Sequence, residues 1–298
     1  GDQFGGKDGR EVVRPGGSPQ SRDACASDRA LAMNTVAEWI ERQGTGFLQR
    51  VEAWARVFRF IATAVARVLS PSLYNRATRL VIQRQIYFTA WQILTGFTAF
   101  AAVFSVVFIQ IVGATARDFG LYAYALELVV RVLVLEILPM MTAFFIALRT
   151  GAAINTEVAL MKIQNELAAL QRMGVDPLRL ELLPRVIGGT VSVLALTAVS
   201  IAVSLALAHL LIIELQPWSL PPGEFTRVIG KVLDLPTMLL LWVKTLAFGL
   251  AVTAIPITEG LATPQRLYHA PIAVLRGMVR LFSALMVIEL AALAVLYV

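Results

Sequence analysis

The residues of this 298-residue chain that could do chemistry are ionisable side chains within otherwise apolar stretches. Glu127 and Arg131 are four residues apart with the acid first, the order that favours an ion pair on a helix. Glu136 follows in the same stretch, about 13 Å along a helix axis from Glu127. Lys244 and Glu289 interrupt two later stretches. Because an unpaired charge in apolar surroundings is costly, we expect Glu136 to face a cavity or a second copy of the chain.

Each of these residues also has a purely structural explanation. Glu127 and Arg131 are explained slightly better as a simple ion pair near the end of a span. We predict that Lys244 extends its ammonium group towards the membrane surface. Glu289 fits equally well as a polar contact between helices and as part of a transport pathway.

The sequence does not group nucleophiles or metal ligands. Cys25 is the single cysteine, so neither an intrachain disulfide nor a cysteine metal site can form. His209 and His269 are the two histidines and are far apart in sequence, which argues against an intramembrane enzyme built on clustered His and Asp groups. We therefore expect no catalytic residue and no metal site in this chain.

The composition is that of a polytopic membrane protein. Hydrophobic residues make up 57% of the chain and charged residues 15%, with a net charge of +6. Soluble domains average roughly 45–50% hydrophobic residues and 25% charged residues. Arginine provides 22 of the 26 basic residues, a bias that suits anionic lipid headgroups and gives no reason to expect a nucleic-acid partner.

Five apolar stretches are long enough to cross a bilayer as helices, which needs about 20 residues. Because lipid cannot satisfy irregular backbone, we predict an all-α integral membrane protein. The expected spans are residues 88–112, 121–148, 186–213, 235–258 and 281–298.

The region before the first span divides into two parts. Residues 1–33 are polar and rich in Gly, Ser and Arg, and we expect a disordered extension ahead of Met33. In residues 34–87, apolar residues recur at helical spacing from Phe47 to Val68, beside an arginine-rich flank. We predict an amphipathic helix in the headgroup region; packing on a soluble core is the alternative. Residues 88–298 then form the five-helix domain.

Basic residues gather in three segments that fall on one side of the membrane. The positive-inside rule therefore predicts a cytoplasmic N-terminus and an external C-terminus. The three segments carry Arg76, Arg79 and Arg84; Arg149, Lys162, Arg172, Arg179 and Arg185; and Arg266, Arg276 and Arg280.

The segment between spans two and three, residues 149–185, contains a short amphipathic helix. Its apolar positions have helical spacing over about residues 157–173. Gly174 is a typical helix stop, and Asp176-Pro177 is typical of an N-cap followed by proline at the first helical position. A helix that projects between two spans can dock a cytoplasmic partner, although a surface helix without a partner explains the pattern equally well.

These same residues resemble the MlaE family, the permease subunits of ABC transporters that work with MCE proteins on lipids. The resemblance covers roughly residues 40–298. It is carried by Leu148-Arg149-Thr150-Gly151-Ala152-Ala153-Ile154-Asn155-Thr156-Glu157-Val158-Ala159-Leu160-Met161-Lys162, by Met173-Gly174-Val175-Asp176-Pro177-Leu178-Arg179, and by Arg84-Gln85-Ile86-Tyr87.

The resemblance implies a homodimer in the bacterial inner membrane that holds lipid between its two copies. It also implies a cytoplasmic ABC ATPase, an accompanying STAS-domain protein and a periplasmic MCE protein. The chain has no Gly-x-x-x-x-Gly-Lys-Ser/Thr loop, so ATP and Mg²⁺ would bind to the ATPase and we expect no cofactor here. Lipid-pathway candidates are Glu136, Arg131, Glu127 and Glu289; ATPase-coupling candidates are Glu157, Lys162, Asn165, Glu166, Arg172, Asp176 and Arg179.

The chain departs from the family pattern in span two. The family's Arg-Glu-Leu-Gly-Pro corresponds to Leu135-Glu136-Ile137-Leu138-Pro139, and Arg131, one turn away, could replace the missing cation. The main alternative function is an ion-coupled secondary transporter of a hydrophobic substrate, because such proteins also bury carboxylates. A structural membrane anchor is a further alternative and would tolerate the loss of residues 149–185.

Overall fold

The computed structural model describes residues 51–70, 76–87, 91–215, 223–266 and 270–297. The chain forms two units, residues 1–55 and 56–298, and of the first unit the structure describes residues 51–55, which are helical. The described part of the second unit consists of helices and short connections, without a strand. The predicted extension over residues 1–33, and the predicted amphipathic helix as far as residue 50, lie outside the described residues.

Five helical stretches are long and apolar enough to cross a membrane, which confirms the predicted class. These spans are Ile93–Ala116, Tyr124–Ile163, Leu178–Ile212, Leu235–Leu261 and Ala270–Leu296. The described elements are α2 (Arg76–Ile86), α3 (Gln92–Asp118), α4 (Tyr122–Leu128), η3 (Val129–Ile137), α5 (Leu138–Ile146), η4 (Ala147–Gly151), α6 (Ala152–Ile163), α7 (Glu166–Arg172), η5 (Leu178–Leu182), α8 (Leu183–His209), η6 (Leu210–Leu215), α9 (Glu224–Val232), α10 (Leu235–Leu261) and α11 (Ala270–Tyr297).

Span five begins at Ala270 and not at residue 281 as the sequence suggested. Arg276 and Arg280, expected in the preceding loop, lie inside α11. Arg280 forms an ion pair with Glu259 of α10. Because that carboxylate meets its charge, the helix can continue through a position that hydropathy alone assigns to a loop.

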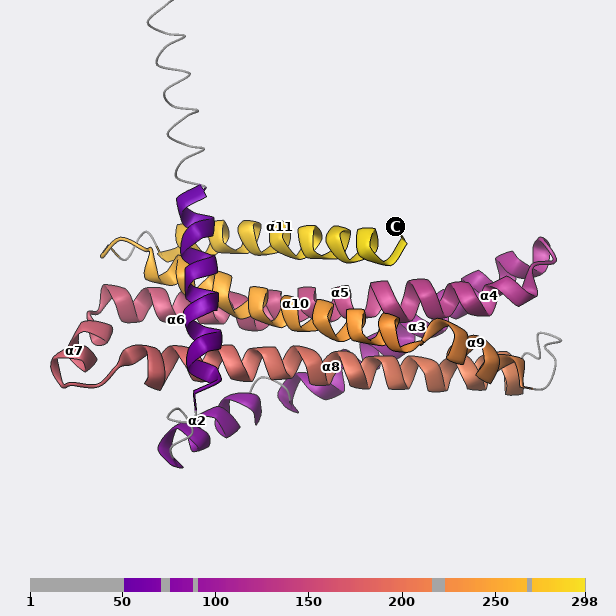
Figure 1. Cartoon of the computed structure of the whole chain (residues 1–298), viewed down its shortest axis with the longest axis horizontal. Helices are drawn as coiled ribbons and strands as arrows, with labels where there is room; N and C mark the ends of the chain where they lie inside the picture. Colours follow the sequence, from indigo (N-terminus) through magenta and orange to yellow (C-terminus); the bar gives the residue numbers. More distant parts are fainter. Residues whose placement is uncertain (1–50, 71–75, 88–90, 216–222, 267–269, 298) are drawn as a thin grey trace, which may run out of the picture. The chain divides into compact units, whose positions relative to one another are not determined.

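The spans lie side by side, and α8 and α10 contact most of the others. Helix α10 packs against α8, α11 and α6, while α3 packs against α8. Helix α7 lies at one end of α8, and α9 lies beside α4 at the other end (Figure 1). We name these two ends the α7 end and the α9 end.

Small residues bring α8 and α10 into close contact. A Cβ on Gly189 would lie 2.3 Å from Thr253 Cγ2, and one on Gly249 would lie 2.9 Å from Thr190 Cα. Each helix therefore places a glycine against a threonine of the other helix. Such pairs allow the backbone approach on which helix association in lipid depends. This contact fixes α10 on α8 and so positions the charges that α10 carries.

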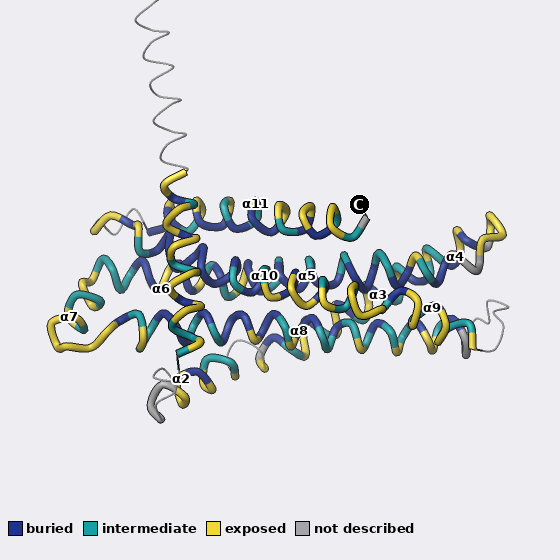
Figure 2. The backbone as a smooth tube through the Cα atoms, viewed as in Figure 1, coloured by how far each residue is buried: buried dark blue, intermediate teal, exposed yellow. Residues whose placement is uncertain are grey.

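Apolar side chains remain on the outer surface of the spans. Val103 of α3 is 66% exposed and Val287 of α11 is 64% exposed, as expected for side chains that face lipid. The tube in Figure 2 is buried along the inner sides of the helices and exposed near α7. In the helical residues 56–68, Ala64 packs on Leu183 while Phe58 of the predicted apolar stripe is 66% exposed.

Candidate functional site

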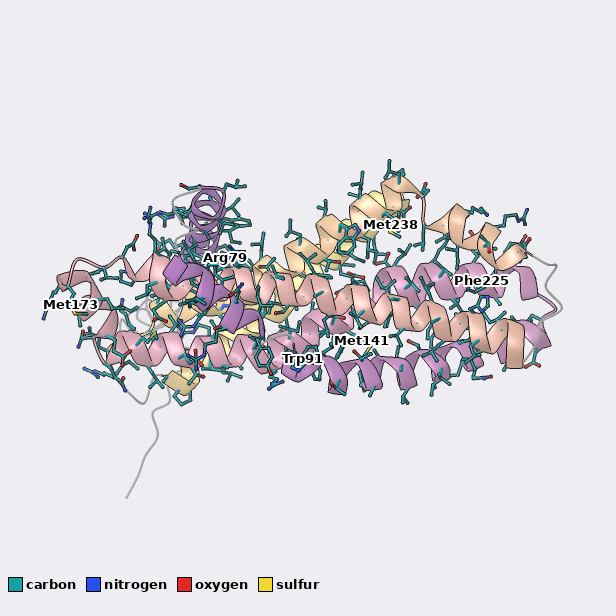
Figure 3. All side chains as sticks on the ribbon, turned by 90° about the horizontal axis from the view of Figure 1, so that it is seen from below. Arg79, Trp91, Met141, Met173, Phe225 and Met238 are labelled. Carbon is teal, nitrogen blue, oxygen red and sulfur yellow. The ribbon has the colours of Figure 1, made fainter. Side chains whose placement is uncertain are left out.

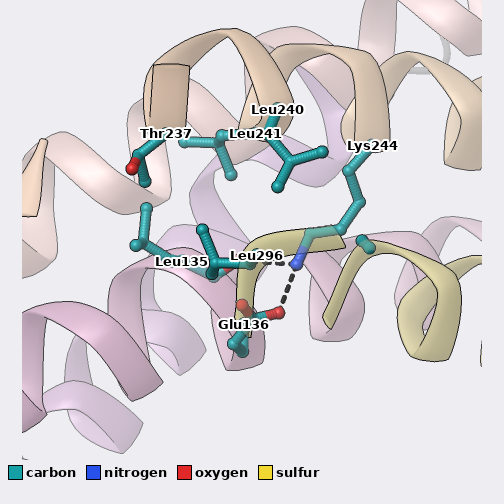
Figure 4. A pocket seen from close by; sticks show the side chains of 8 residues that line it. Leu135, Glu136, Thr237, Leu240, Leu241, Lys244 and Leu296 are labelled. Atoms are coloured by element: carbon teal, nitrogen blue, oxygen red, sulfur yellow. Dashed lines mark hydrogen bonds and ion pairs between the residues drawn. The ribbon is translucent and has the colours of Figure 1, made fainter. Parts of the chain in front are cut away.

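Three charged side chains from different spans meet in the interior of the helix bundle. Lys244 Nζ of α10 lies 2.5 Å from Glu136 Oε2 of η3 and 3.3 Å from Glu289 Oε2 of α11. The same ammonium group donates to the carbonyl oxygen of Leu135 at 2.8 Å. Figure 4 shows Lys244 pointing across to Glu136, between leucines of neighbouring helices. Two carboxylates therefore share one cation, and we name Glu136, Lys244 and Glu289 the central cluster.

The prediction for Lys244 was wrong. Its side chain is only 3% exposed, so its ammonium group does not reach the membrane surface. The physical reason is the pairing: two carboxylates and a carbonyl replace the hydration that an extended lysine would obtain from headgroups. The Glu289 side chain is 7% exposed and that of Glu136 is 14% exposed, so Glu136 is the member nearest to an open surface.

Depth along the helices is a sequence signal for the central cluster, but it is not sufficient to predict it. At 1.5 Å per residue, Glu136 lies about 18 Å from Tyr124, Lys244 about 14 Å from Leu235, and Glu289 about 10 Å from Leu296. All three distances run from the α9 end, and each places its charge about two to three helical turns inside its span. The cluster also requires spans two, four and five to lie next to one another, and spacing in the sequence does not reveal this.

A second charged group lies nearer the α9 end. Glu127 Oε1 accepts from Arg131 Nε at 3.0 Å, and Glu127 Oε2 is 3.2 Å from Lys231 Nζ of α9. The ion pair expected from the i, i+4 spacing is present, and Lys231 joins it. The group therefore connects span two to α9. It does not join the central cluster among the described contacts.

An apolar groove of about 230 Å³ lies beside this group, between the end of α3 and the start of α4. Its lining includes Ile111, Phe119, Tyr124 and Leu128. Thr115 also lines it, but its hydroxyl donates to the Ile111 carbonyl oxygen at 2.9 Å. The groove therefore offers hydrocarbon contact. By contrast, the cavity beside the central cluster is about 10 Å³, the size of one water molecule and too small for a lipid headgroup.

The predicted single helix over residues 157–173 is two helices. Helix α6 ends at Ile163, α7 begins at Glu166, and Asn165 between them has φ 60°. Asparagine tolerates this left-handed conformation better than most residues, which explains a break that apolar periodicity alone would miss. The predicted stop at Gly174 is confirmed, with φ +78°. Asp176 caps the next helix as expected, because its Oδ1 accepts from Leu178 N at 3.0 Å.

Three contacts hold the α6–α7 segment in place. Asp176 Oδ2 pairs with Arg67 Nη1 at 2.6 Å. Asn165 Oδ1 accepts from Gln265 Nε2 at 2.8 Å, which ties the turn to the connection between spans four and five. The third contact is the guanidinium group of Arg185, which bridges Glu157 of α6 at 3.3 Å and Glu181 at 3.1 Å. Glu157, Asn165 and Asp176, all predicted coupling residues, are therefore engaged within the chain.

The remaining coupling candidates point outward. Glu166, Arg172 and Arg179 are exposed and Lys162 is half-buried. Within the described part of the chain, neither Glu166 nor Arg172 has an ion-pair partner. Met173, 69% exposed, lies at the tip of the α7 end, opposite Phe225 at the α9 end (Figure 3). The tip thus combines unpaired charges with an exposed apolar side chain, which suits a protein partner.

Among the described residues, no three His, Cys, Asp or Glu side chains are grouped so that they could hold a metal ion. His209 contacts Phe225 edge-on, with ring centroids 5.0 Å apart. Outside the spans, hydrogen bonds from Thr237 hold the pKa of the Asp234 carboxyl below its usual range. Asp234 Oδ1 accepts from Thr237 N at 3.2 Å and so caps α10.

Comparison with known proteins identifies the family. Residues 82–295 match the family described as Permease MlaE. The chain is 30% identical over 181 residues to the intermembrane phospholipid transport system permease protein MlaE of Haemophilus influenzae, with 57% of this chain and 68% of that protein covered. It is 30% identical over 128 residues to a probable ABC transporter permease protein of Synechocystis, with 43% and 48% covered. A probable ABC transporter permease protein of Rickettsia typhi is 28% identical over 158 residues, with 53% and 58% covered. This multi-pass membrane protein therefore belongs to the MlaE permease family.

Proposed function

We propose that this chain is the membrane-spanning permease of an ABC transport system for phospholipid. It would work as a homodimer in the bacterial inner membrane and exchange lipid with a periplasmic MCE protein. A separate cytoplasmic ATPase, accompanied by a STAS-domain protein, would bind ATP and Mg²⁺. The observation that carries this proposal is the α6–α7 segment: α6 forms the end of span two, α7 lies between spans two and three, and three contacts brace the segment from within the chain.

The proposed orientation places the α7 end in the cytoplasm. The positive-inside rule supports this orientation, because basic residues before span one and on either side of α7 fall at that end. Glu166, Arg172 and Met173 would then form the contact with the ATPase. The C-terminus and the groove between α3 and α4 would lie on the periplasmic side.

The lipid would lie between the two copies. A two-tailed lipid needs an apolar wall and a few polar contacts, and the 10 Å³ cavity of one chain cannot enclose it. Glu136, the most accessible member of the central cluster, would face the headgroup, and Arg131 would supply a cation for its phosphate. The groove of about 230 Å³ would hold part of an acyl chain.

The function is tested by purifying the tagged protein in mild detergent and identifying co-purifying subunits and lipids by mass spectrometry. We expect a polypeptide with a phosphate-binding Gly-x-x-x-x-Gly-Lys-Ser/Thr loop, together with phospholipid. The double variant Glu166→Ala, Arg172→Ala should retain less of that polypeptide, whereas Arg227→Ala at the α9 end should retain as much as wild type. Glu136→Leu should change the bound lipid load.

Two results would contradict this proposal. One is a wild-type preparation that lacks any such ATPase. The other is lipid transport by the purified chain in liposomes, driven by an ion gradient without ATP, which would favour the secondary-transporter alternative.

A further inference from the structure

Helices α6, α10 and α11 cross closely at the α7 end, and a glycine lies at each of two contact points. A Cβ on Gly260 of α10 would lie 2.9 Å from Val158 Cβ and 3.0 Å from the carbonyl oxygen of Asn155, both in α6. A Cβ on Gly277 of α11 would lie 2.2 Å from Asn155 Nδ2 and 3.3 Å from Glu259 Cβ. An added methyl group would therefore meet α6 at Gly260 and the buried Asn155 amide at Gly277.

Polar contacts fasten the same crossing. Asn155 is fully buried, and its Nδ2 donates to the carbonyl oxygen of Ala273 at 3.3 Å, which joins α6 to α11. Glu259 of α10, with a side chain 6% exposed, forms an ion pair with Arg280 of α11. Because a buried charge separated from its partner is costly, sliding any one of the three helices against the others is disfavoured.

This crossing lies between α7 and the central cluster. Helix α6 leads through the turn at Asn165 into α7. On the other side, α10 carries Lys244 about 22 Å from Glu259, and α11 carries Glu289 about 18 Å from Gly277, both along their axes. The crossing therefore connects α7, through α6, to spans four and five as well as to span two.

We propose that Asn155, Gly277 and the Glu259–Arg280 pair are the positioning residues that transmit movement of α7 to α10 and α11, and so to the central cluster. This inference rests on the proposed function, because an ATPase must supply the movement. None of these residues touches lipid or nucleotide in this account. Their role is to keep the three helices together when one of them is pushed.

The test uses the complete complex in proteoliposomes and compares lipid moved per ATP hydrolysed. Gly277→Ala should lower this ratio at least about five-fold, within the range expected for a coupling residue, while ATPase co-purification and ATP hydrolysis stay within about two-fold of wild type. The matched control is Gly96→Ala in α3, where an added Cβ has no atom within 4 Å. That control should leave the ratio unchanged.

Two further variants separate transmission from misfolding. Glu259→Gln, which removes the ion pair without changing side-chain shape, should lower the ratio in the same way as Gly277→Ala. Asn155→Ala, which removes the hydrogen bond that joins α6 to α11, should also lower the ratio.

An unchanged ratio in both Gly277→Ala and Glu259→Gln would overturn the inference and leave the proposed function standing. Equal losses of hydrolysis and transport, together with loss of the ATPase, would also overturn it. Failure of the wild-type complex to hydrolyse ATP or move lipid would overturn the proposed function and this inference with it.

Discussion

The charges at the centre of the spans and those around α7 are held under opposite conditions. In the central cluster, the side chains of Lys244, Glu136 and Glu289 are between 3% and 14% exposed. At the α7 end, Arg67 and Asp176 are 43% and 41% exposed. Removing one partner of an ion pair destabilises the protein strongly inside the membrane and only slightly in water. The buried charges therefore fix which spans stay together, whereas the exposed charges orient a segment that can still be rearranged.

The largest effect should come from removing the shared cation. Lys244→Met leaves two carboxylates without their partner in a buried site, and should lower the free energy of unfolding by about 3–5 kcal/mol. Thermal unfolding in detergent measures this loss. The matched control is Lys231→Met, because Lys231 is 64% exposed and its partner Glu127 keeps Arg131. Similar unfolding temperatures for the two variants would contradict this expectation.

Arg185 forms ion pairs that are intermediate in exposure between these two groups of charges. Its side chain is 11% exposed, but its partners Glu157 and Glu181 are 56% and 32% exposed and would remain hydrated without it. Arg185→Met should therefore lower the free energy of unfolding by about 1.5–3 kcal/mol, the range for hydrogen bonds to charged groups. Chemical or thermal unfolding under the same detergent conditions measures it. If Arg185→Met lowered the free energy of unfolding as much as Lys244→Met does, exposure of the partner carboxylates would not determine the size of the loss.

The exposed pair at the α7 end should matter little to stability. Arg67→Ala should change the free energy of unfolding by about 0–1 kcal/mol, because water can replace both partners. Its effect should be seen instead in hydrogen exchange, as faster exchange in residues 164–176. An unfolding loss of several kcal/mol, or unchanged exchange, would contradict this assignment.

A modest effect should come from the cap of α10 at the α9 end. Asp234 has a lowered pKa in the folded protein, so the cap contributes fully above the ordinary Asp pKa of about 3.9 and is lost as pH falls through the lowered value. Asp234→Ala should therefore lower the unfolding temperature slightly at pH 7, and the difference should disappear in acid. Asp234→Asn, which keeps a capping oxygen, should behave like wild type at pH 7.

The sequence predicts the spans well because long apolar stretches have few alternatives in lipid. It misplaces the start of span five because Arg280 is paired, and pairing depends on a neighbour that hydropathy does not include. The same limit explains Lys244, whose partners come from two other spans. Asn165 breaks the expected helix through its own backbone conformation, which apolar spacing does not reveal. The crossing at Gly277 depends entirely on helix adjacency.

The most direct test of the account is site-specific photo-cross-linking in native membranes. A photoreactive residue at Met173, at the tip of the α7 end, should cross-link to a polypeptide that binds ATP. A photoreactive residue in place of Arg227, at the α9 end, should not cross-link to that polypeptide. Cross-linking of the ATP-binding polypeptide from position 227, or labelling of position 173 by a membrane-impermeant reagent added from the periplasmic side, would contradict the account.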